Sequence, residues 1–131
     1  MKQTQVVAAV FVNDQKEIFC ARRKNIGELA LKWEFPGGKI ELHETPEQAL
    51  KRELLEELEI NITVLKPFLT VHHQYKSFTI TLTSFLCSAN LDNYALNDHV
   101  EAKWVPANEL VLLDWADADL PIVNKILEVF K

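Results

Sequence analysis

The sequence has few of the residues that would place it in a specialised class of protein. Its 131 residues include only three glycines and two cysteines. Collagen-like and disulfide-rich proteins need far more of these residues, so both classes are excluded. Hydrophobic residues make up 48% and charged residues 25%, which is ordinary globular usage. A chain of this length fits one domain, and we expect a single domain over residues 1–131.

Long apolar stretches are also absent. No stretch approaches the roughly 20 residues that a membrane-spanning helix needs. The first apolar stretch, 6–12, is broken at once by Asn13 and Asp14 and is too short for a signal peptide. Cys20 and Cys87 lie apart, in strand-like stretches and not in a metal-ligand spacing, which predicts buried free thiols. We therefore expect a cytoplasmic protein that does not bind membranes.

Positive charge is scarce. The chain has 14 Lys and Arg against 19 Asp and Glu, a formal net charge of −5. Proteins that bind nucleic-acid polymers usually carry an excess of Lys and Arg, so that partner is not expected. An anionic substrate would have to be held by local cations or by a metal ion.

The remaining pattern predicts an α/β protein with both strands and helices. Residues 5–12 and 17–22 flank a polar turn and predict a β-hairpin. Residues 33–38 combine a short strand with a proline and two glycines that break it. Further strands are expected over 62–65, 68–73, 77–87 and 102–105, with a helical turn at 106–110 and an amphipathic helix from Pro121.

A second helix is predicted to begin at Pro46. Thr45 is a helix-capping residue, and Gln48 follows it at the spacing of a capping box. The apolar face of this helix comprises Leu50, Leu54, Leu55 and Leu58.

Glutamates gather on a neighbouring face of this helix. Glu53, Glu56 and Glu57 recur at i, i+3 and i+4, and only Arg52 offers local compensation. One interpretation is a solvated acidic face. The other is a Mg²⁺ or Mn²⁺ site, because these ions prefer oxygen ligands and are commonly held together with substrate phosphates. That site would suit metal-assisted attack of water on a phosphoryl group.

The spacing of these residues resembles a known signature. From Gly38, five residues lead to Glu44, seven more lead to the Arg52-Glu53-Leu54 triplet, and one more leads to Glu56-Glu57, with Ile60 closing a pattern of 23 residues. This resembles the Nudix hydrolases. The VVAAV opening, the WEFPGG segment, the strand at 80–82 and Trp104 are similar to the MutT-type branch, so the resemblance covers nearly the whole chain. It implies an α/β/α sandwich with a mixed sheet, a signature loop and helix, and a C-terminal helix.

The resemblance also implies roles for the signature residues. Glu53, Glu56 and Glu57 would bind Mg²⁺ or Mn²⁺, together with a backbone carbonyl at Gly37 or Gly38. Arg52 would orient these carboxylates through charge-assisted hydrogen bonds. Glu44 would lie behind the metal ligands and support them.

A further carboxylate is implied six residues before Trp104, at Asp98. Glu101 is a rival for that role, and each of the two has an alternative interpretation as a solvent-facing residue. Arg23 and Lys39 would contact phosphates. The alternative for the basic cluster at 22–24 is a solvated strand end.

One position departs from the family pattern. Relatives have glycine where this chain has Glu59, so the usual left-handed end of the helix is in doubt. We expect a local adjustment and retained activity, because Glu59 is not one of the signature carboxylates.

The resemblance implies a nucleoside triphosphate substrate, cleaved to the monophosphate and pyrophosphate by a monomer or weak homodimer. Asp119 lies in a segment that resembles the base-reading part of MutT-like enzymes. An ionised Asp only accepts hydrogen bonds, which favours CTP or a modified pyrimidine and leaves 8-oxo-dGTP as the alternative. Phe35 and Tyr75 are candidate walls for the base, although Phe35 also fits a plain core residue.

Two other hypotheses concern binding. A catalytically silent Nudix-fold module would be expected to lose a signature Glu or Arg, and this chain keeps them all. Adjacent strand residues face opposite ways, so His72 and His73 are not expected to chelate one ion. His99 is expected to form hydrogen bonds within a loop.

Overall fold

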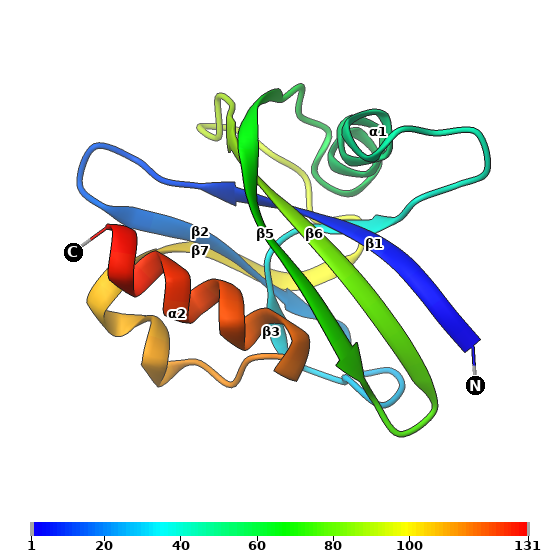
Figure 1. The fold of residues 1–131 in the computed structure, drawn as a ribbon. Coiled ribbons are helices and arrows are strands. Elements are labelled where there is room, and N and C mark those ends of the chain that lie inside the picture. The colour runs from blue at the N-terminus through cyan, green and yellow to red at the C-terminus, as the bar shows by residue number, and fades with distance from the viewer. Residues whose placement is uncertain (1, 131) are drawn as a thin grey trace.

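The computed structural model describes residues 2–130, and it shows two sheets and two α-helices (Figure 1). A four-stranded mixed sheet lies between α1 and α2, as the predicted α/β/α sandwich requires, and the C-terminal helix is present. None of the helices in residues 2–130 has the length and apolar character to cross a membrane. The strands are β1 (Lys2–Phe11), β2 (Glu17–Arg23), β3 (Trp33–Glu34), β4 (Gly37–Lys39), β5 (Thr63–Gln74), β6 (Phe78–Ser88) and β7 (His99–Pro106). The helices are α1 (Pro46–Leu58), α2 (Leu120–Val129) and the 3₁₀ helices η1 (Ala107–Leu112) and η2 (Asp117–Asp119).

The strand pairing corrects the predicted hairpin. The mixed sheet has the order β4-β1-β6-β5, with β1 parallel to β6 and antiparallel to β4. The second sheet, β3-β2-β7, is antiparallel. Only Val12 and Ile18 form a bridge between the two predicted hairpin arms. The hairpin was wrong for most of its length because both edges of β1 are taken by other strands.

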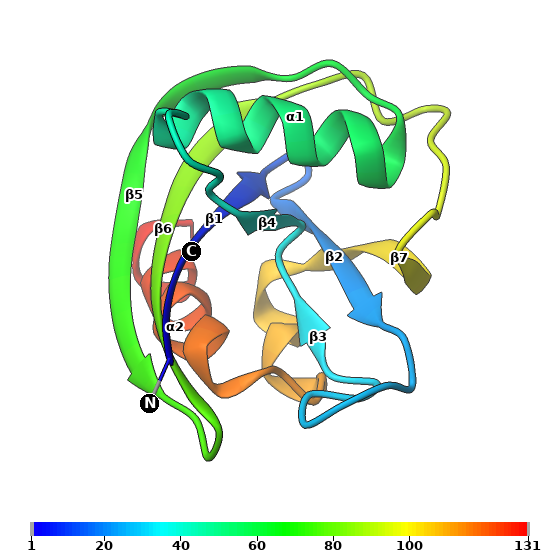
Figure 2. The same ribbon diagram turned by 90° about the vertical axis from the view of Figure 1, so that its right-hand side faces the viewer.

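Strand β1 supplies side chains to both layers of the core. Val7, Ala9 and Phe11 belong to the apolar cluster under α1. Ala8 and Val10, which alternate with them, belong to the cluster under α2. A strand that is apolar on both faces is what a sheet covered on both sides requires. The two helices therefore lie on opposite faces of the sheet (Figure 2).

The segment after α1 differs from prediction. The strands expected at 62–65 and 68–73 form one long strand, β5, whose register against β6 shifts between Val64 and Lys66 and again between Pro67 and Leu69. Proline has no backbone N–H to donate to a strand partner, so it is tolerated at such irregularities. A short turn that includes Tyr75 and Lys76 connects β5 to β6.

Helix α1 begins where the sequence predicted. The Thr45 hydroxyl accepts from Gln48 N at 3.1 Å, and the Gln48 side chain accepts from Thr45 N at 2.9 Å, which completes the capping box. Leu50, Leu54 and Leu58 are fully buried. Leu55 is 52% exposed and does not belong to the buried face, which corrects its assignment. The glutamates therefore lie beside a narrow apolar stripe.

The end of α1 keeps the left-handed conformation despite the missing glycine. Glu59 has φ 56° and ψ 42°, so the expected adjustment of the backbone does not occur. The loop before β7 accounts for this: Asn97 donates through its backbone N to Glu57 O and through Nδ2 to Glu56 O and to Glu59 Oε2. Ala95 N donates to Leu58 O. These contacts satisfy the last carbonyls of the helix.

Replacing Glu59 by glycine should stabilise the protein. An L-residue in the left-handed conformation costs about 1–2 kcal/mol. Two effects reduce the gain from glycine: the variant loses the Asn97 contact, and glycine has greater conformational freedom in the unfolded chain. We expect Glu59→Gly to raise the free energy of unfolding by about 0.5–1 kcal/mol, measured by urea denaturation. Glu59→Ala keeps the strain and loses the contact, so it should be no more stable than the parent. A glycine variant less stable than the alanine variant would contradict this account.

Candidate active site

The two glycines before α1 allow an unusually close approach of backbone and side chains. A Cβ on Gly37 would overlap the backbone of Val7 in β1. A Cβ on Gly38 would overlap the carboxyl group of Glu53. The Gly38 position is therefore open only because it has no side chain, and the Glu53 carboxylate lies directly against the backbone there.

Arg52 is the centre of the ionic contacts around the glutamates. Its Nε donates to Glu44 Oε2 at 2.6 Å and its Nη1 to Glu53 Oε1 at 2.9 Å. Nη1 also lies 3.3 Å from the Glu56 carboxylate, and Nη2 donates to Lys39 O at 2.9 Å. The hydrogen bond from Arg52 lowers the pKa of Glu44 below its ordinary value. One guanidinium thus fixes three carboxylates and the signature loop.

Glu57 is buried beside this cluster and is 3% exposed. Its Oε1 atom has no hydrogen-bond partner among the described residues. The pKa of Glu57 is raised to about 10, mainly by burial and also by a hydrogen bond with Glu53 and the charge of Glu34. An ionised carboxylate in such a place calls for a cation.

The donor set fits a hard divalent cation. Glu53 and Glu57 are in contact, and the Gly38 backbone lies against Glu53. The Glu56 carboxylate is more exposed and turned toward Arg52. Within residues 2–130 no three acidic, histidine or cysteine side chains already stand close enough to share one ion. The unpartnered Oε1 of Glu57 and the oxygen-only chemistry of the set match the preferences of Mg²⁺ or Mn²⁺.

The structure distinguishes the two loop carboxylates. Asp98 and Glu57 line the same cavity of about 330 Å³, and the charge of Asp98 contributes to the raised pKa of Glu57. Glu101 lies on β7, where it forms an ion pair of 3.7 Å with Arg22. Asp98 is therefore the carboxylate that is brought toward the α1 glutamates.

Two residues of the site were missed by sequence reasoning, Glu34 and His99. His99 does not lie in a loop but opens β7, and it is 5% exposed. Its Nε2 lies 2.9 Å from Glu34 Oε2, and Glu34 Oε1 accepts from Arg23 Nη1 at 3.0 Å. The available signal was Glu34 itself, a charged residue between the buried aromatic residues Trp33 and Phe35.

The adjacent histidines His72 and His73 line neither the cavity beside Glu57 nor the larger cavity that adjoins it. His72 is exposed, and its Nδ1 contacts Thr81 Oγ1 at 3.0 Å. His73 packs edge-on against Tyr75, with ring centroids 4.5 Å apart. The two neighbouring side chains thus have different partners, in keeping with the expectation that they do not share an ion.

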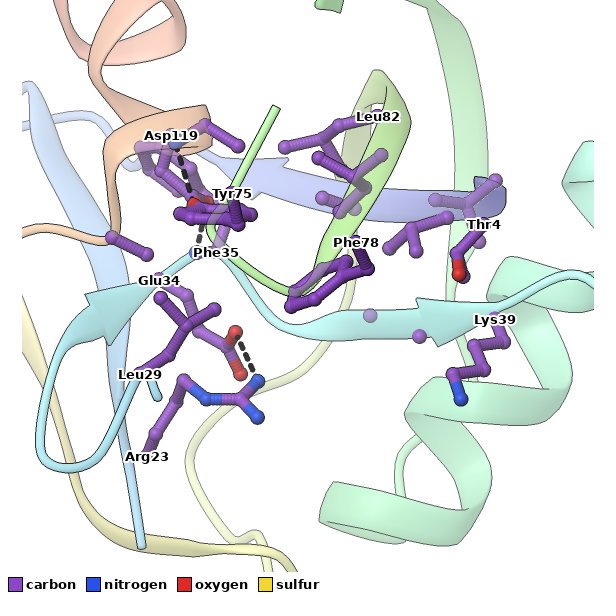
Figure 3. A pocket seen from close by; sticks show the side chains of 18 of the residues that line it. Thr4, Arg23, Leu29, Glu34, Phe35, Lys39, Tyr75, Phe78, Leu82 and Asp119 are labelled. Atoms are coloured by element: carbon purple, nitrogen blue, oxygen red, sulfur yellow. Dashed lines mark hydrogen bonds and ion pairs between the residues drawn. The ribbon is translucent and has the colours of Figure 1, made fainter. Parts of the chain in front are cut away.

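A larger cavity of about 470 Å³ adjoins the smaller one, and Arg23, Glu34 and Gly37 line both. Phe35, Tyr75 and Asp119 gather at one end of it, and Lys39 lies at the opposite end (Figure 3). The Arg23–Glu34 ion pair lines both this cavity and the smaller one beside Glu57. The cavity can therefore hold an elongated molecule that has an apolar, ring-shaped end and an anionic end.

Asp119 is a buried residue in the wall of the larger cavity. It is 6% exposed, and its Oδ1 accepts from Phe35 N at 3.1 Å. Burial raises the pKa of Asp119 well above its ordinary value, and the charge of Glu34 adds to the shift. The raised pKa favours the protonated form of Asp119 more than in an exposed carboxyl group. A neutral carboxyl group donates one hydrogen bond and also accepts.

The two aromatic candidates both line the cavity and are both anchored in the core. Phe35 stacks on Trp115 with ring centroids 4.8 Å apart. The Tyr75 hydroxyl accepts from Ala118 N at 2.8 Å, which ties the tip of the β5–β6 turn to the segment before α2. Phe35 is therefore a core residue and a cavity wall at the same time.

The fold and the site match a Nudix hydrolase of the MutT type. The matching features are the sheet between two helices and the glutamate-bearing helix that follows a glycine pair. A family model described as the NUDIX domain matches residues 7–125. The chain belongs to this family, and it is a hydrolase that acts on phosphoric anhydride bonds.

Similar proteins support this assignment. An 8-oxo-dGTP diphosphatase of Escherichia coli (strain K12) is 33% identical over 126 residues, covering 96% of this chain and 98% of the relative. A CTP pyrophosphohydrolase of the same organism is 32% identical over 127 residues, covering 97% and 93%. A solved structure of MutT (family Nudix hydrolase) from methicillin-resistant Staphylococcus aureus 252 is 40% identical, has a TM-score of 0.77, and matches 98% of each chain.

The two glycines should respond differently to the same substitution. In Gly38→Ala the new methyl group contacts the end of the flexible Glu53 side chain, so the protein should still fold. Its Mn²⁺ affinity, measured by calorimetry without nucleotide, should fall about 10–100-fold. Gly37→Ala meets the β1 backbone and should lower the melting temperature by several degrees. Unchanged Mn²⁺ affinity in Gly38→Ala would show that the Glu53 position does not matter for the metal.

Proposed function

We propose that this chain is a Mg²⁺-dependent nucleoside triphosphate pyrophosphohydrolase of the cytoplasm. Water adds to one phosphorus of the triphosphate, the bridging P–O bond breaks, and the products are the nucleoside monophosphate and pyrophosphate, with release of a proton. The observation that carries the proposal is the pair of adjoining cavities, which joins a base-sized apolar end at Asp119 to the carboxylates at Glu57.

The glutamates of α1 would hold the metal. Glu53, Glu56 and Glu57 supply carboxylates, Gly38 supplies a backbone carbonyl, and Asp98 approaches from the loop before β7. When bound, Mg²⁺ or Mn²⁺ would neutralise phosphate charge and lower the pKa of bound water. Arg52 keeps the like-charged carboxylates in place, and its bond to Glu44 fixes the guanidinium from behind.

The phosphates would be bound by Arg23 and Lys39. Arg23 lines both cavities and has an Nε atom without a partner among residues 2–130, so the guanidinium can serve Glu34 and a phosphate together. Lys39 lies at the end of the larger cavity, beside the carboxylate helix. These two cations offset the local negative charge that would otherwise repel the substrate.

We propose CTP or a modified pyrimidine nucleotide as the substrate. The Asp119 carboxyl group can accept from the amino group of cytosine, and in its protonated form it also donates to N3, while Phe35 and Tyr75 flank the ring. The second candidate is 8-oxo-dGTP, because a guanine edge also offers an acceptor beside a donor and because relatives carry that name. The size of the cavity accommodates either base.

The enzyme hypothesis is tested against a silent binding module with Glu57→Gln. In a phosphate-release assay with Mg²⁺ and pyrophosphatase, we expect kcat to fall about 10²–10⁴-fold, the range for loss of an acid–base group. Glu47→Gln, an exposed position in the first turn of the same helix, should behave like the parent. Equal, negligible rates for the parent and Glu57→Gln across a nucleotide panel would support the silent module and exclude the enzyme.

The base assignment is tested by kcat/KM for CTP, dCTP, 5-methyl-dCTP, dGTP and 8-oxo-dGTP. We expect cytosine nucleotides to rank first and Asp119→Ala to reduce discrimination about 10–100-fold, the value of one or two buried hydrogen bonds. Asp119→Asn keeps a donor and an acceptor and should preserve more of the ranking than alanine does. A ranking led by 8-oxo-dGTP would favour the second substrate, and an unchanged ranking in Asp119→Ala would remove Asp119 from base recognition.

A further inference from the structure

The smaller cavity, of about 330 Å³, contains an unusual set of polar atoms. The buried side-chain atoms without a hydrogen-bond partner in residues 2–130 are Arg23 Nε, Glu57 Oε1 and His99 Nδ1. All three residues line this one cavity. Buried polar atoms are normally paired with protein or with ordered water, so the cavity is built to receive a hydrogen-bonding molecule.

The contact with Glu34 determines what His99 offers to the cavity. Glu34 already accepts from Arg23 through its other oxygen, so we assign the hydrogen of the 2.9 Å contact with Glu34 Oε2 to His99 Nε2. The opposite atom, Nδ1, is then free to accept. It lies 3.9 Å from Glu57 Oε1, which is too far for a direct hydrogen bond. One water molecule can bridge two groups at that separation.

We propose that His99 and Glu57 together hold the water that attacks the triphosphate, an inference that rests on the proposed function. The water donates one hydrogen to His99 Nδ1 and the other to Glu57 Oε1. Its lone pairs then face the cavity, where Arg23 would bind phosphate. Glu34 is a positioning residue, since it holds the imidazole through Nε2 and Arg23 through Oε1.

Two near-isosteric variants separate this role from a purely structural one. The amide of asparagine falls near the Nδ1 position of histidine, so His99→Asn keeps an acceptor toward the cavity and loses the Glu34 contact. The longer glutamine reaches the Nε2 position, so His99→Gln keeps the Glu34 contact and loses the acceptor. If His99 only anchors β7, glutamine is the better replacement; if it positions water, asparagine is.

We expect His99→Gln to lower kcat about 10–100-fold at saturating Mg²⁺ and nucleotide, with KM changed less than about 3-fold, because the lost interaction acts on the reacting water. His99→Asn should keep at least about ten times the kcat of His99→Gln. His72→Gln, at an exposed histidine outside both cavities, should match the parent. Activity of His99→Gln at or above that of His99→Asn overturns the proposal.

Two readouts do not depend on turnover. Histidine-selective ¹⁵N NMR of the Mg²⁺-free protein should show His99 protonated at Nε2 and unprotonated at Nδ1, and a proton at Nδ1 contradicts the proposal. A high-resolution crystal structure of the parent should show ordered water within hydrogen-bond distance of both Nδ1 and Glu57 Oε1, and its absence also contradicts it. If the parent fails to hydrolyse any nucleotide, the proposed function fails; if the parent turns over and His99→Gln equals it, only the role of His99 fails.

Discussion

The site depends on the close approach of the Gly37–Gly38 backbone to its neighbours. Gly37 allows β4 to lie against β1, and Gly38 leaves room for the Glu53 carboxylate. A side chain at either position would separate the sheet from α1 or displace the carboxylate. The core under α1, which includes Leu50 and Leu54, holds this helix against the sheet. The Glu53 carboxylate therefore lies against the backbone of Gly38, where no side chain intervenes.

The second constraint is the concentrated negative charge of the site. Two arginines each contact a different group of carboxylates and offset part of this charge. Arg52 donates hydrogen bonds to Glu44, Glu53 and Glu56, while Arg23 donates one to Glu34. Among the glutamates of α1, Glu57 has no such cation and is buried, and its pKa is raised mainly by that burial. The protein thus leaves one strongly basic oxygen where metal, water and substrate would meet.

Features that depend on residues close together in the sequence were predictable. The capping box at Thr45 and the spacing of Glu53, Glu56 and Glu57 act within one helix, so they were evident from the sequence. The hairpin was not, because an apolar strand such as β1 does not reveal which strands occupy its edges. Leu55 was misplaced for a similar reason: a helix has several apolar positions, but packing against β1 decides which of them are buried.

The sequence by itself determined the family and the carboxylate helix, because these follow from residue identity and local spacing. Only the tertiary structure decided that Glu59 could keep a conformation suited to glycine, since Asn97 reaches it from 38 residues away. It also decided the burial of Asp119, which raises the pKa of that residue, and the link from Arg23 through Glu34 to His99. These features depend on burial and on contacts between distant segments, and folding alone creates both.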